Sequence, residues 1–178
     1  MKKEIEVFDY TEKIMKALQK GVLLTTKTDD KINSMVISWG TLGIEWGKPI
    51  FTVFVRENRF TKQQLDENPE FTINIPLGEY DKKIIAVCGT KSGHNMDKIK
   101  ELSLTTETPN KILVPGIKEL PLTLECRVVY KQKQDENSVT DENRKNFYPQ
   151  DVDGSFHGAN KDYHSAYYGE IVSAYIIE

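Results

Sequence analysis

The sequence predicts a mainly β protein of the α+β class, an antiparallel barrel with short helices at its periphery. At least six segments have the β-branched, apolar or alternating pattern of strands. The helices between them are short and do not alternate regularly with the strands, as they would around a parallel sheet. With 178 residues the chain is long enough for a sizeable core, so residues 1–178 are expected to form a single domain.

The amino-terminal part predicts one helix followed by one strand. Asp9 and Glu12 have the spacing of a capping box, and apolar residues then recur at helical spacing until Gly21. Residues 22–28 are rich in β-branched side chains and predict a strand, which the turn at 29–31 ends.

Two further strands and a second helix are expected next. A strand over 32–40 is followed by a glycine-rich connection over 40–49. The strand over 50–55 is nearly all apolar and is therefore expected to be covered on both faces. A second capping box begins at Thr61 and starts a helix that must end before Pro69.

The remaining elements are separated by proline, glycine and polar loops. They are a strand over 71–75, helices over 81–88 and 96–102, and strands over 121–130 and 166–177. The polar segment 131–162 is expected to form long loops with about one helical turn, and not a separate domain.

Composition excludes several classes of function. The net charge of -3 and the pI of about 5.7 give no overall field that favours nucleic acid. No run of ~20 apolar residues is present to cross a bilayer, and no apolar run follows Lys2 and Lys3 to make a signal peptide. Cys88 and Cys126 lack the spacing of a metal or redox pair, so we expect two buried free thiols in a cytoplasmic protein.

The strand over 33–40 carries the first candidate site. One of its faces holds only the small residues Ser34, Val36, Ser38 and Gly40. Such a face lets a flat ligand approach the backbone N–H and C=O groups. The alternative interpretation is a core strand whose small residues let a helix pack closely.

The second candidate site follows where a strand ends and a helix begins. Arg56 and Arg59 supply two guanidinium groups, Asn58 an amide and Thr61 a hydroxyl. Charge-assisted bonds and the free N–H groups of a helix start hold phosphate well. A flat ring with a phosphate indicates a nucleotide-like cofactor, with flavin mononucleotide (FMN) as the leading candidate, although the two arginines could equally be a solvated surface pair.

The loop over 89–93 is similar to a phosphate-binding loop but fails the Walker A pattern, because Ile85 and Thr90 stand where glycines are required. As part of a flavin site it makes chemical sense, since an ammonium group near the pyrimidine edge would stabilise the anionic reduced ring. Lys91 is the residue in question.

No metal site and no catalytic side chain are predicted. The histidines His94, His157 and His164 have no zinc-ligand spacing, and the segment 151–154 fails the register of a calcium loop. There is also no Gly-x-Gly-x-x-Gly fingerprint, nucleophile elbow or Ser/His/Asp set.

Several segments together resemble the flavin reductase-like, FMN-binding split-barrel family, and within it the flavoredoxin-type branch. They are residues 33–40, Pro49, 56–61, 68–76, 88–98 and 168–172. The resemblance implies a Greek-key split barrel, FMN bound at a homodimer interface, and flavin redox chemistry. Two positions depart from the family pattern: Asn58 stands where many relatives have serine, and His94 replaces a frequent arginine.

By that resemblance, the cofactor site is assigned residue by residue. The strand residues face the isoalloxazine ring, a second group holds the phosphate, and a loop closes over the ring or the ribityl chain. These groups are, in order, Asn33 with Met35, Val36, Ile37, Ser38 and Trp39; Arg56, Asn58, Arg59 and Thr61; and Lys91, Ser92 and Gly93. His164 is expected to reach the flavin through the long loop, although no motif anchors that assignment.

Two functions from different classes agree with this site. The favoured one is an oxidoreductase that passes electrons from NAD(P)H through FMN to free flavin, a partner protein or a small acceptor; the other is an electron carrier without NAD(P)H activity. A barrel that has lost its flavin is a third interpretation. Aromatic residues are more numerous near the site than one small barrel needs inside, which favours a homodimer. They are Trp39, Trp46, Phe51 and Phe60.

Overall fold

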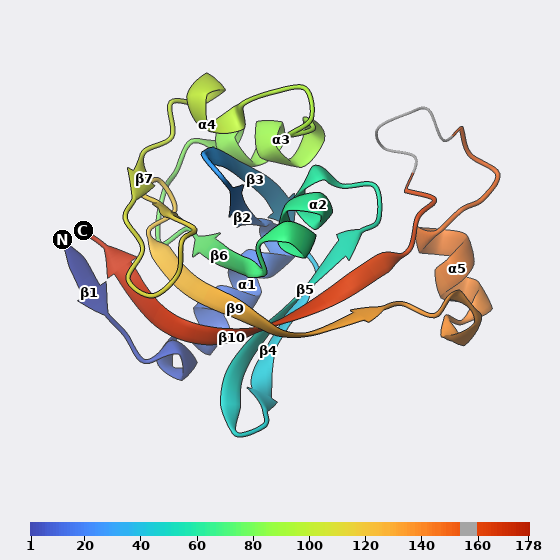
Figure 1. Cartoon of the computed structure of the whole chain (residues 1–178), viewed down its shortest axis with the longest axis horizontal. Coiled ribbons are helices and arrows are strands. Elements are labelled where there is room, and N and C mark those ends of the chain that lie inside the picture. The colour runs from blue at the N-terminus through green and yellow to red at the C-terminus, as the bar shows by residue number, and fades with distance from the viewer. Residues whose placement is uncertain (154–159) are drawn as a thin grey trace.

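A computed structural model of the protein describes residues 1–153 and 160–178 (Figure 1). The strands are β1 Lys2–Glu4, β2 Val22–Thr28, β3 Lys31–Ile37, β4 Gly40–Glu45, β5 Lys48–Arg56, β6 Glu70–Ile75, β7 Thr106–Glu107, β8 Gly116–Ile117, β9 Leu122–Lys133 and β10 His164–Ile177. The helices are α1 Thr11–Lys20, α2 Phe60–Glu67, α3 Lys82–Thr90, α4 Lys98–Glu101 and α5 Asp141–Phe147, with the short 3-10 helices η1 Val7–Tyr10 and η2 Glu136–Ser138.

The main sheet has the strand order β3-β2-β6-β9-β10-β5-β4, and β1 adds to β10. Each of these neighbouring pairs is antiparallel. Neighbours such as β2 and β6, or β5 and β10, lie far apart in the chain, which is the Greek-key property. The path ends in β3 and β4, which do not pair with each other in the described part of the chain. The predicted antiparallel split barrel with short peripheral helices is therefore confirmed.

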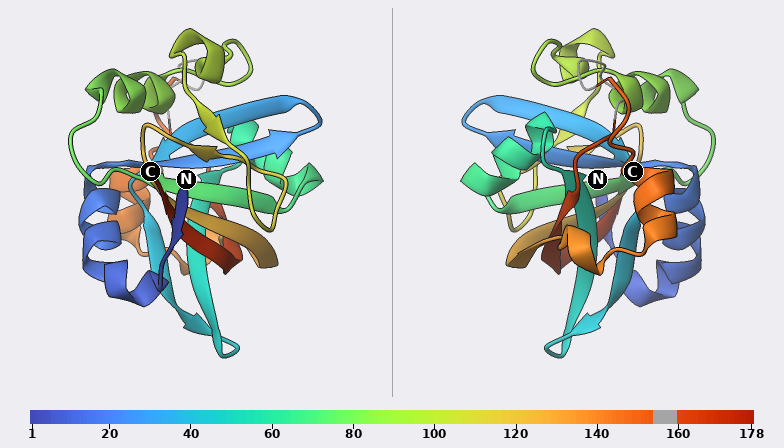
Figure 2. Two further views of the ribbon diagram at one scale, coloured as in Figure 1. Left: turned by 90° about the vertical axis from the view of Figure 1, so that its left-hand side faces the viewer. Right: turned by 90° about the vertical axis from the view of Figure 1, so that its right-hand side faces the viewer.

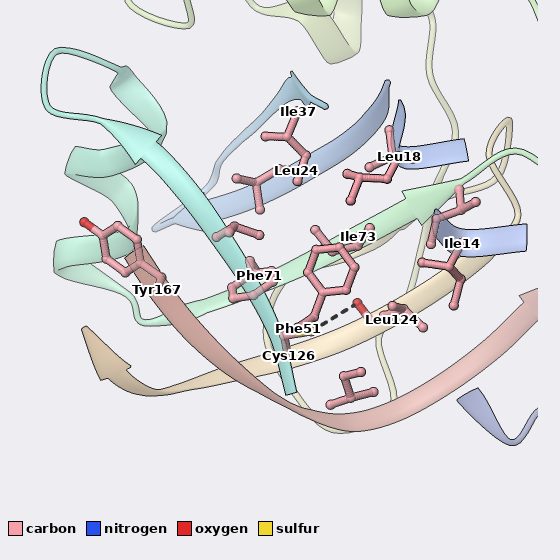
Figure 3. Packing of buried hydrophobic residues seen from close by; sticks show 14 of the residues in the cluster. Ile14, Leu18, Leu24, Ile37, Phe51, Phe71, Ile73, Leu124, Cys126 and Tyr167 are labelled. Atoms are coloured by element: carbon pink, nitrogen blue, oxygen red, sulfur yellow. Dashed lines mark hydrogen bonds between the residues drawn. The ribbon is translucent and has the colours of Figure 1, made fainter. Parts of the chain in front are cut away.

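The main core fills the barrel beneath α1. Ile14 and Leu18 of α1 are almost completely buried and point toward the inner faces of the strands (Figure 3). Phe51, Phe71 and Leu124 come from three different strands and belong to the same cluster. Helix α1 contacts both β4 and β6, so its apolar face packs against strands from both halves of the sheet path.

A second, smaller core lies on the other face of β2. Leu23 points out of the barrel while its neighbours Val22 and Leu24 point in, and Leu23 packs with Ile84 and Cys88 of α3. Helices α3 and α4 lie over β2 and β3 in all three views (Figures 1 and 2). Strand β2 is therefore covered on both faces.

Strands β9 and β10 continue past the end of β6 as an arm, in which β10 also pairs with β5 along its other edge. Their pairing continues from Leu122 opposite Ile176 to Lys133 opposite Ser165. Figure 1 shows the arm reaching α5, the helix farthest from the amino-terminal strands. The arm therefore carries residues 134–153 past one end of the barrel.

Three sequence-based expectations about the elements were wrong. The connection over 40–49 is a β-hairpin of β4 and β5, whose two-residue turn places Trp46 and Gly47 at positive φ of 51° and 69°. The strand over 32–40 ends at Ile37. The segment 131–162 contains α5, a helix of 7 residues, and begins as the last part of β9.

The prediction of two capping boxes was also wrong. Helix α1 follows η1 directly, and its N-cap residue Tyr10 makes no side-chain cap bond. Helix α2 starts after Arg59, again without such a bond. The side chains that looked like a cap form tertiary contacts instead: Asn33 donates to the Thr61 hydroxyl, and Thr26 donates to Gln64.

Candidate functional site

A groove runs along β3, the strand that ends the sheet path. Its first part is a cavity of about 150 Å³ lined by residues from β3, β5 and β10 and from the connection between β3 and β4. The lining residues are Met35, Val36, Ile37, Ser38, Trp39, Phe54, Arg56, Arg59 and His164.

The second part is a cavity of about 110 Å³ between β3, the start of α2 and the loop after α3. Its lining consists of Asn33, Met35, Val36, Asn58, Arg59, Phe60, Thr61, Cys88, Gly89, Lys91, Ser92, Gly93 and Lys98. Because Met35, Val36 and Arg59 line both cavities, the two are parts of one groove. Every residue predicted for the cofactor site lines one part or the other; what binds there remains a prediction.

His164 is the buried polar group of the first cavity. Its side chain is 5% exposed, and its Nδ1 atom lies 2.9 Å from the hydroxyl of Tyr148. Burial lowers the pKa of His164 to about 4, and the positive charge of Arg56 adds to this shift. The imidazole is therefore neutral at pH 7. The ring of Trp39 lies against it with a centroid separation of 5.2 Å.

Arg56 lies in the first cavity and is held by backbone carbonyls. Its guanidinium donates to the carbonyl oxygens of Asn160 and Asp162 at 2.9 and 2.6 Å and to that of Phe147 at 3.0 Å. It also lies over the ring of Tyr148, 5.1 Å from the centroid. Burial lowers the pKa of Arg56. This guanidinium fastens the segment after α5 to the end of β5.

The structure divides the predicted phosphate group of Arg56, Asn58, Arg59 and Thr61 between the two parts of the groove. Asn58 and Thr61 line the second cavity and Arg56 the first, with only Arg59 of the predicted phosphate group reaching both. Arg59 also donates to the side-chain oxygen of Asn160 at 3.0 Å. The reason is geometric: residues at the end of a strand and in the first turn of the next helix point in different directions.

Lys98 is a cationic lining residue that the site prediction missed. It is 2% exposed, and its ammonium donates to the carbonyl of Lys91 at 3.3 Å. Burial lowers the pKa of Lys98; the Cys88 thiol opposes this shift and Arg59 adds to it. A buried lysine beside Arg59 makes the second cavity a place for an anion. The only signal in the sequence was the position of Lys98 at the end of the segment 88–98.

The loop with Lys91, Ser92 and Gly93 lies directly against β3 and α2. A Cβ atom on Gly93 would fall 2.4 Å from Oδ1 of Asn33 and 2.6 Å from Cδ1 of Phe60. Only glycine permits this approach. The loop is thereby held over the second cavity, and Asn33 is fixed in turn by its 2.9 Å bond to Thr61.

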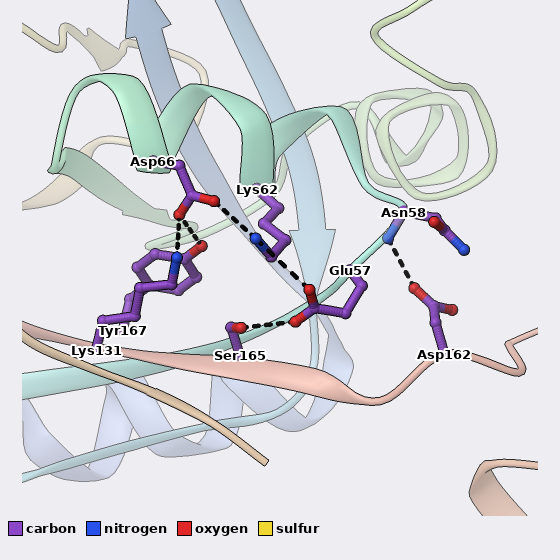
Figure 4. Close-up of polar contacts among 8 residues, drawn as sticks. All are labelled: Glu57, Asn58, Lys62, Asp66, Lys131, Asp162, Ser165 and Tyr167. Atoms are coloured by element: carbon purple, nitrogen blue, oxygen red, sulfur yellow. Dashed lines mark hydrogen bonds and ion pairs between the residues drawn. The ribbon is translucent and has the colours of Figure 1, made fainter.

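A polar network fastens α2 to β9 and β10 (Figure 4). Asp66 accepts a hydrogen bond of 2.6 Å from Tyr167 and ion-paired bonds from Lys62 and Lys131. Burial raises the pKa of Asp66, but these bonds outweigh burial and lower it to about 2. Nearby, the backbone N–H of Asn58 donates to Asp162 at 2.8 Å. The groove is thus bordered by elements with fixed positions.

Of the small-residue face predicted for residues 33–40, Val36 and Ser38 line the groove, whereas Ser34 does not. Ser34 is completely buried and shares a 2.7 Å hydrogen bond with Thr25. Helix α3 packs on this face, where a Cβ atom on Gly89 would lie 3.5 Å from Val36. The alternative interpretation, small residues that admit a helix, is therefore correct for Ser34.

Among residues 1–153 and 160–178, no group of three His, Cys, Asp or Glu side chains is placed to hold a metal ion. His94 stacks edge-on against Phe60, with centroids 4.9 Å apart. His157 and Gly154 lie outside the described residues. Cys88 and Cys126 are free and buried, as expected. No helix in the described part of the chain is long and apolar enough to cross a bilayer.

Comparison with known proteins identifies the fold. Flavoredoxin from Methanosarcina acetivorans superimposes with a TM-score of 0.63 at 24% identity, over 89% of this chain and 68% of that one. The FMN-binding domain of a flavin reductases-like enzyme from Shewanella baltica has a TM-score of 0.63 at 14% identity, over 99% of this chain and 77% of that one.

Sequence comparison extends this likeness. An uncharacterized protein of Archaeoglobus fulgidus is 34% identical over 100 residues, 56% of this chain and 55% of that protein. The chain thus matches only a little more than half the length of this relative. The model of the family described as the flavin reductase like domain matches residues 15–178. The chain therefore belongs to the flavin reductase like family.

Proposed function

We propose that the protein binds FMN in the groove along β3 and works as an oxidoreductase that passes electrons from NAD(P)H to free flavin, a protein partner or a small acceptor. The observation that carries the proposal is the joining of two unlike cavities through Met35, Val36 and Arg59. The first has apolar and aromatic walls with a neutral histidine and the guanidinium of Arg56, which backbone carbonyls already hold. The second adds two lysines, hydroxyl groups and amides to the shared Arg59. In FMN a flat ring is joined to a phosphate, so the ring would lie in the first cavity and the phosphate in the second.

The donor set of the second cavity fits a phosphate. Arg59 and Lys98 supply positive charge, and Ser92 and Asn58 supply neutral donors. The loop over Asn33, which only Gly93 permits, would close the site over the ribityl chain. In the first cavity, β3 ends the sheet path, so the backbone groups of one of its edges are available to hydrogen-bond the polar edge of a ring.

Bound FMN would supply the redox chemistry itself, by accepting and giving up two electrons. The chain's own residues then bind and orient it: Met35 to Trp39 position the ring, while Arg59, Thr61 and Lys98 position the phosphate. Lys91 would add positive charge that favours the anionic reduced form. Arg56 and His164 hold the wall of the first cavity, and neither is required as an acid or base.

The proposal includes a homodimer. A patch of exposed apolar side chains covers the β4–β5 turn and the adjoining arm: Ile44, Trp46 and Tyr130 are 71%, 58% and 44% exposed. The rings of Trp46 and Tyr130 lie 6.3 Å apart, and Tyr168 lies 5.1 Å from Tyr130. Contiguous apolar surface of this kind is usually covered by a partner, and a two-fold dimer is the commonest closed assembly.

The test is the colour of the purified protein followed by an assay. A yellow preparation whose released chromophore migrates as FMN supports the cofactor proposal, and oxidation of NADH or NADPH that free FMN accelerates supports the reductase. FMN binding without NAD(P)H oxidation would favour the alternative, an electron carrier. A colourless protein that cannot be reconstituted with FMN would overturn both.

A further inference from the structure

A third cavity, of about 450 Å³, lies between the barrel and the arm. Trp39 and Phe54 form its barrel side, while Val139, Asn143 and Phe147 come from the segment at the end of the arm. The volume is within the ~300–1,000 Å³ of small-molecule sites. The groove assigned to FMN does not use this space.

The described lining of this cavity carries no ionised side chain at neutral pH. Most of its surface comes from aromatic and aliphatic groups, with two amides, Gln134 and Asn143. His164 also lines it and is neutral, because burial keeps its pKa at about 4. The nearest charged group, Arg56, lines the adjoining first cavity, and its guanidinium already donates to three backbone carbonyls. An ionised ligand would therefore give up part of its hydration against a lining that offers no group of opposite charge, which disfavours it.

The third cavity adjoins the first. Trp39, Phe54 and His164 line both. Trp39 is 39% exposed and meets Phe147 edge-on, with centroids 5.3 Å apart. A planar molecule in the third cavity would therefore share these aromatic walls with whatever occupies the first cavity.

The position of the two amides indicates what polar group the ligand carries. The side-chain oxygen of Gln134 accepts the backbone N–H of His164 at 3.3 Å, which directs the donating end of that amide elsewhere. Asn143 is exposed on α5, also lines the cavity, and carries a second amide NH₂ group. Amide NH₂ groups donate to carbonyl oxygens.

We propose that this cavity binds an uncharged, planar aromatic molecule with carbonyl oxygens, of the quinone type. Binding follows from the lining alone; the role of the quinone as electron acceptor rests on the proposed function. In that role one NAD(P)H and one solvent proton are consumed for each quinone. The C–H bond of the dihydronicotinamide breaks, NAD(P)⁺ is released, and two O–H bonds form on the hydroquinone.

Binding is measured through Trp39. The Trp46→Phe variant leaves Trp39 as the sole tryptophan of the chain, so quenching of its emission reports on the cavity. The protein as purified is titrated with 1,4-naphthoquinone and with 1,4-naphthoquinone-2-sulfonate, which differs by one negative charge. N-acetyltryptophanamide corrects for collisional quenching. We expect saturable quenching by the neutral quinone and at least 10-fold weaker binding of the sulfonate.

A matched pair of substitutions tests whether the quinone binds in the third cavity. Asn143→Asp adds a charge to the lining with almost no change of shape, whereas Asn137→Asp makes the same change at an exposed position in η2 that does not line the cavity. Asn143→Asp should weaken naphthoquinone at least 10-fold and Asn137→Asp should not. Val139→Asp is a second variant with the same expected loss.

Three results would overturn the proposal. The first is equal affinity for the neutral and the sulfonated quinone, and the second is unchanged quinone affinity in both Asn143→Asp and Val139→Asp. The third is a Trp39 emission that changes with the concentration of the protein but not with the concentration of quinone. The last result would mean that a second copy of the chain covers the cavity. FMN titration of the same variants separates the two proposals, because Asn143→Asp should leave FMN affinity unchanged even where quinone binding is lost.

Discussion

The Nδ1 atom of His164 lies 2.9 Å from the hydroxyl of Tyr148, which joins the first residue of β10 to the segment that follows α5. The same tyrosine stacks on Tyr163, with centroids 4.5 Å apart and planes inclined by 12°. Because Arg56 also lies over Tyr148, one aromatic ring connects the arm, the groove and the end of β5. Protonation of His164 would put a second positive charge beside Arg56.

This arrangement predicts that the protein loses stability in mild acid. The pKa of His164 is about 4 in the folded state, below its ordinary 6.5, so the unfolded chain binds more protons between these values. Stability should therefore be complete above about pH 6.5 and fall by on the order of 2–3 kcal/mol as the pH drops to 4. Urea unfolding at several pH values measures this. In His164→Gln the slope over this range should flatten, and an unchanged slope would contradict the assignment.

The phosphate is expected to depend on Lys98 more than on Arg56. Lys98→Met keeps the length of the side chain and removes its charge, so FMN should bind at least ~10-fold more weakly. Riboflavin, which lacks the phosphate, should bind almost unchanged. Arg56→Ala releases three backbone carbonyls and should weaken both ligands together. Fluorescence titration with the two flavins distinguishes these outcomes, and equal losses for Lys98→Met would exclude its phosphate role.

The close packing around Gly93 allows a steric test of the groove. In Gly93→Ala the new methyl group would meet Asn33 and Phe60, so the loop must move away from β3 and FMN affinity should fall at least ~10-fold. Gly78→Ala is the control, because nothing lies within 4 Å of the position of its Cβ atom. Isothermal calorimetry with FMN and thermal melting are the measurements. Equal FMN affinities for the two variants would refute a role for the loop.

Lys91 is expected to tune the redox potential of bound FMN. A positive charge near the ring favours the anionic reduced form, so Lys91→Met should lower the midpoint potential while oxidised FMN still binds. Lys100→Met removes an exposed lysine of α4 that does not line the groove, and it serves as the control. A dye-coupled redox titration measures the midpoint potential. The same potential in the wild type, in Lys91→Met and in Lys100→Met would contradict this hypothesis.

The homodimer proposal predicts that charge in the exposed aromatic patch separates the subunits. Trp46→Asp and Tyr130→Asp should shift the mass in light scattering from dimer to monomer and release FMN at the same time. Leu113 is also apolar and 69% exposed but lies away from the patch, so Leu113→Asp should leave the dimer intact. A wild-type protein that stays monomeric and keeps its flavin would refute this part of the proposal.

The strands of the barrel core could be predicted from the sequence because burial on two faces leaves a continuous apolar pattern, as in residues 50–55. The β4–β5 hairpin could not, because its outer residues are exposed and its turn uses Trp46, which seldom adopts a positive φ. The capping boxes failed for a different reason. Thr61 and Gln64 have the spacing of a local motif, but tertiary partners on β2 and β3 satisfy their side chains.

Much of the candidate site was also predictable, since a strand, a strand end and a loop within residues 33–93 supply most of the groove. The sequence could not show which partners these side chains contact or which of them are buried. The carbonyls that hold Arg56 come from Phe147 and later residues, about half the chain away. The burial of Lys98 depends on how α4 packs against β3, which no local pattern reveals.

Under the two proposals, the arm formed by β9 and β10 makes flavin binding and the choice of electron acceptor separable in evolution. The FMN groove is built mainly from β3, the end of β5, the start of α2 and the loop after α3, whereas one wall of the third cavity is carried at the tip of the arm. A graft of residues 134–150 from a relative would therefore exchange acceptor preference and leave the flavin in place. The condition is that the graft keeps the backbone position at residue 147, where the carbonyl accepts from Arg56 and joins the exchanged part to the barrel.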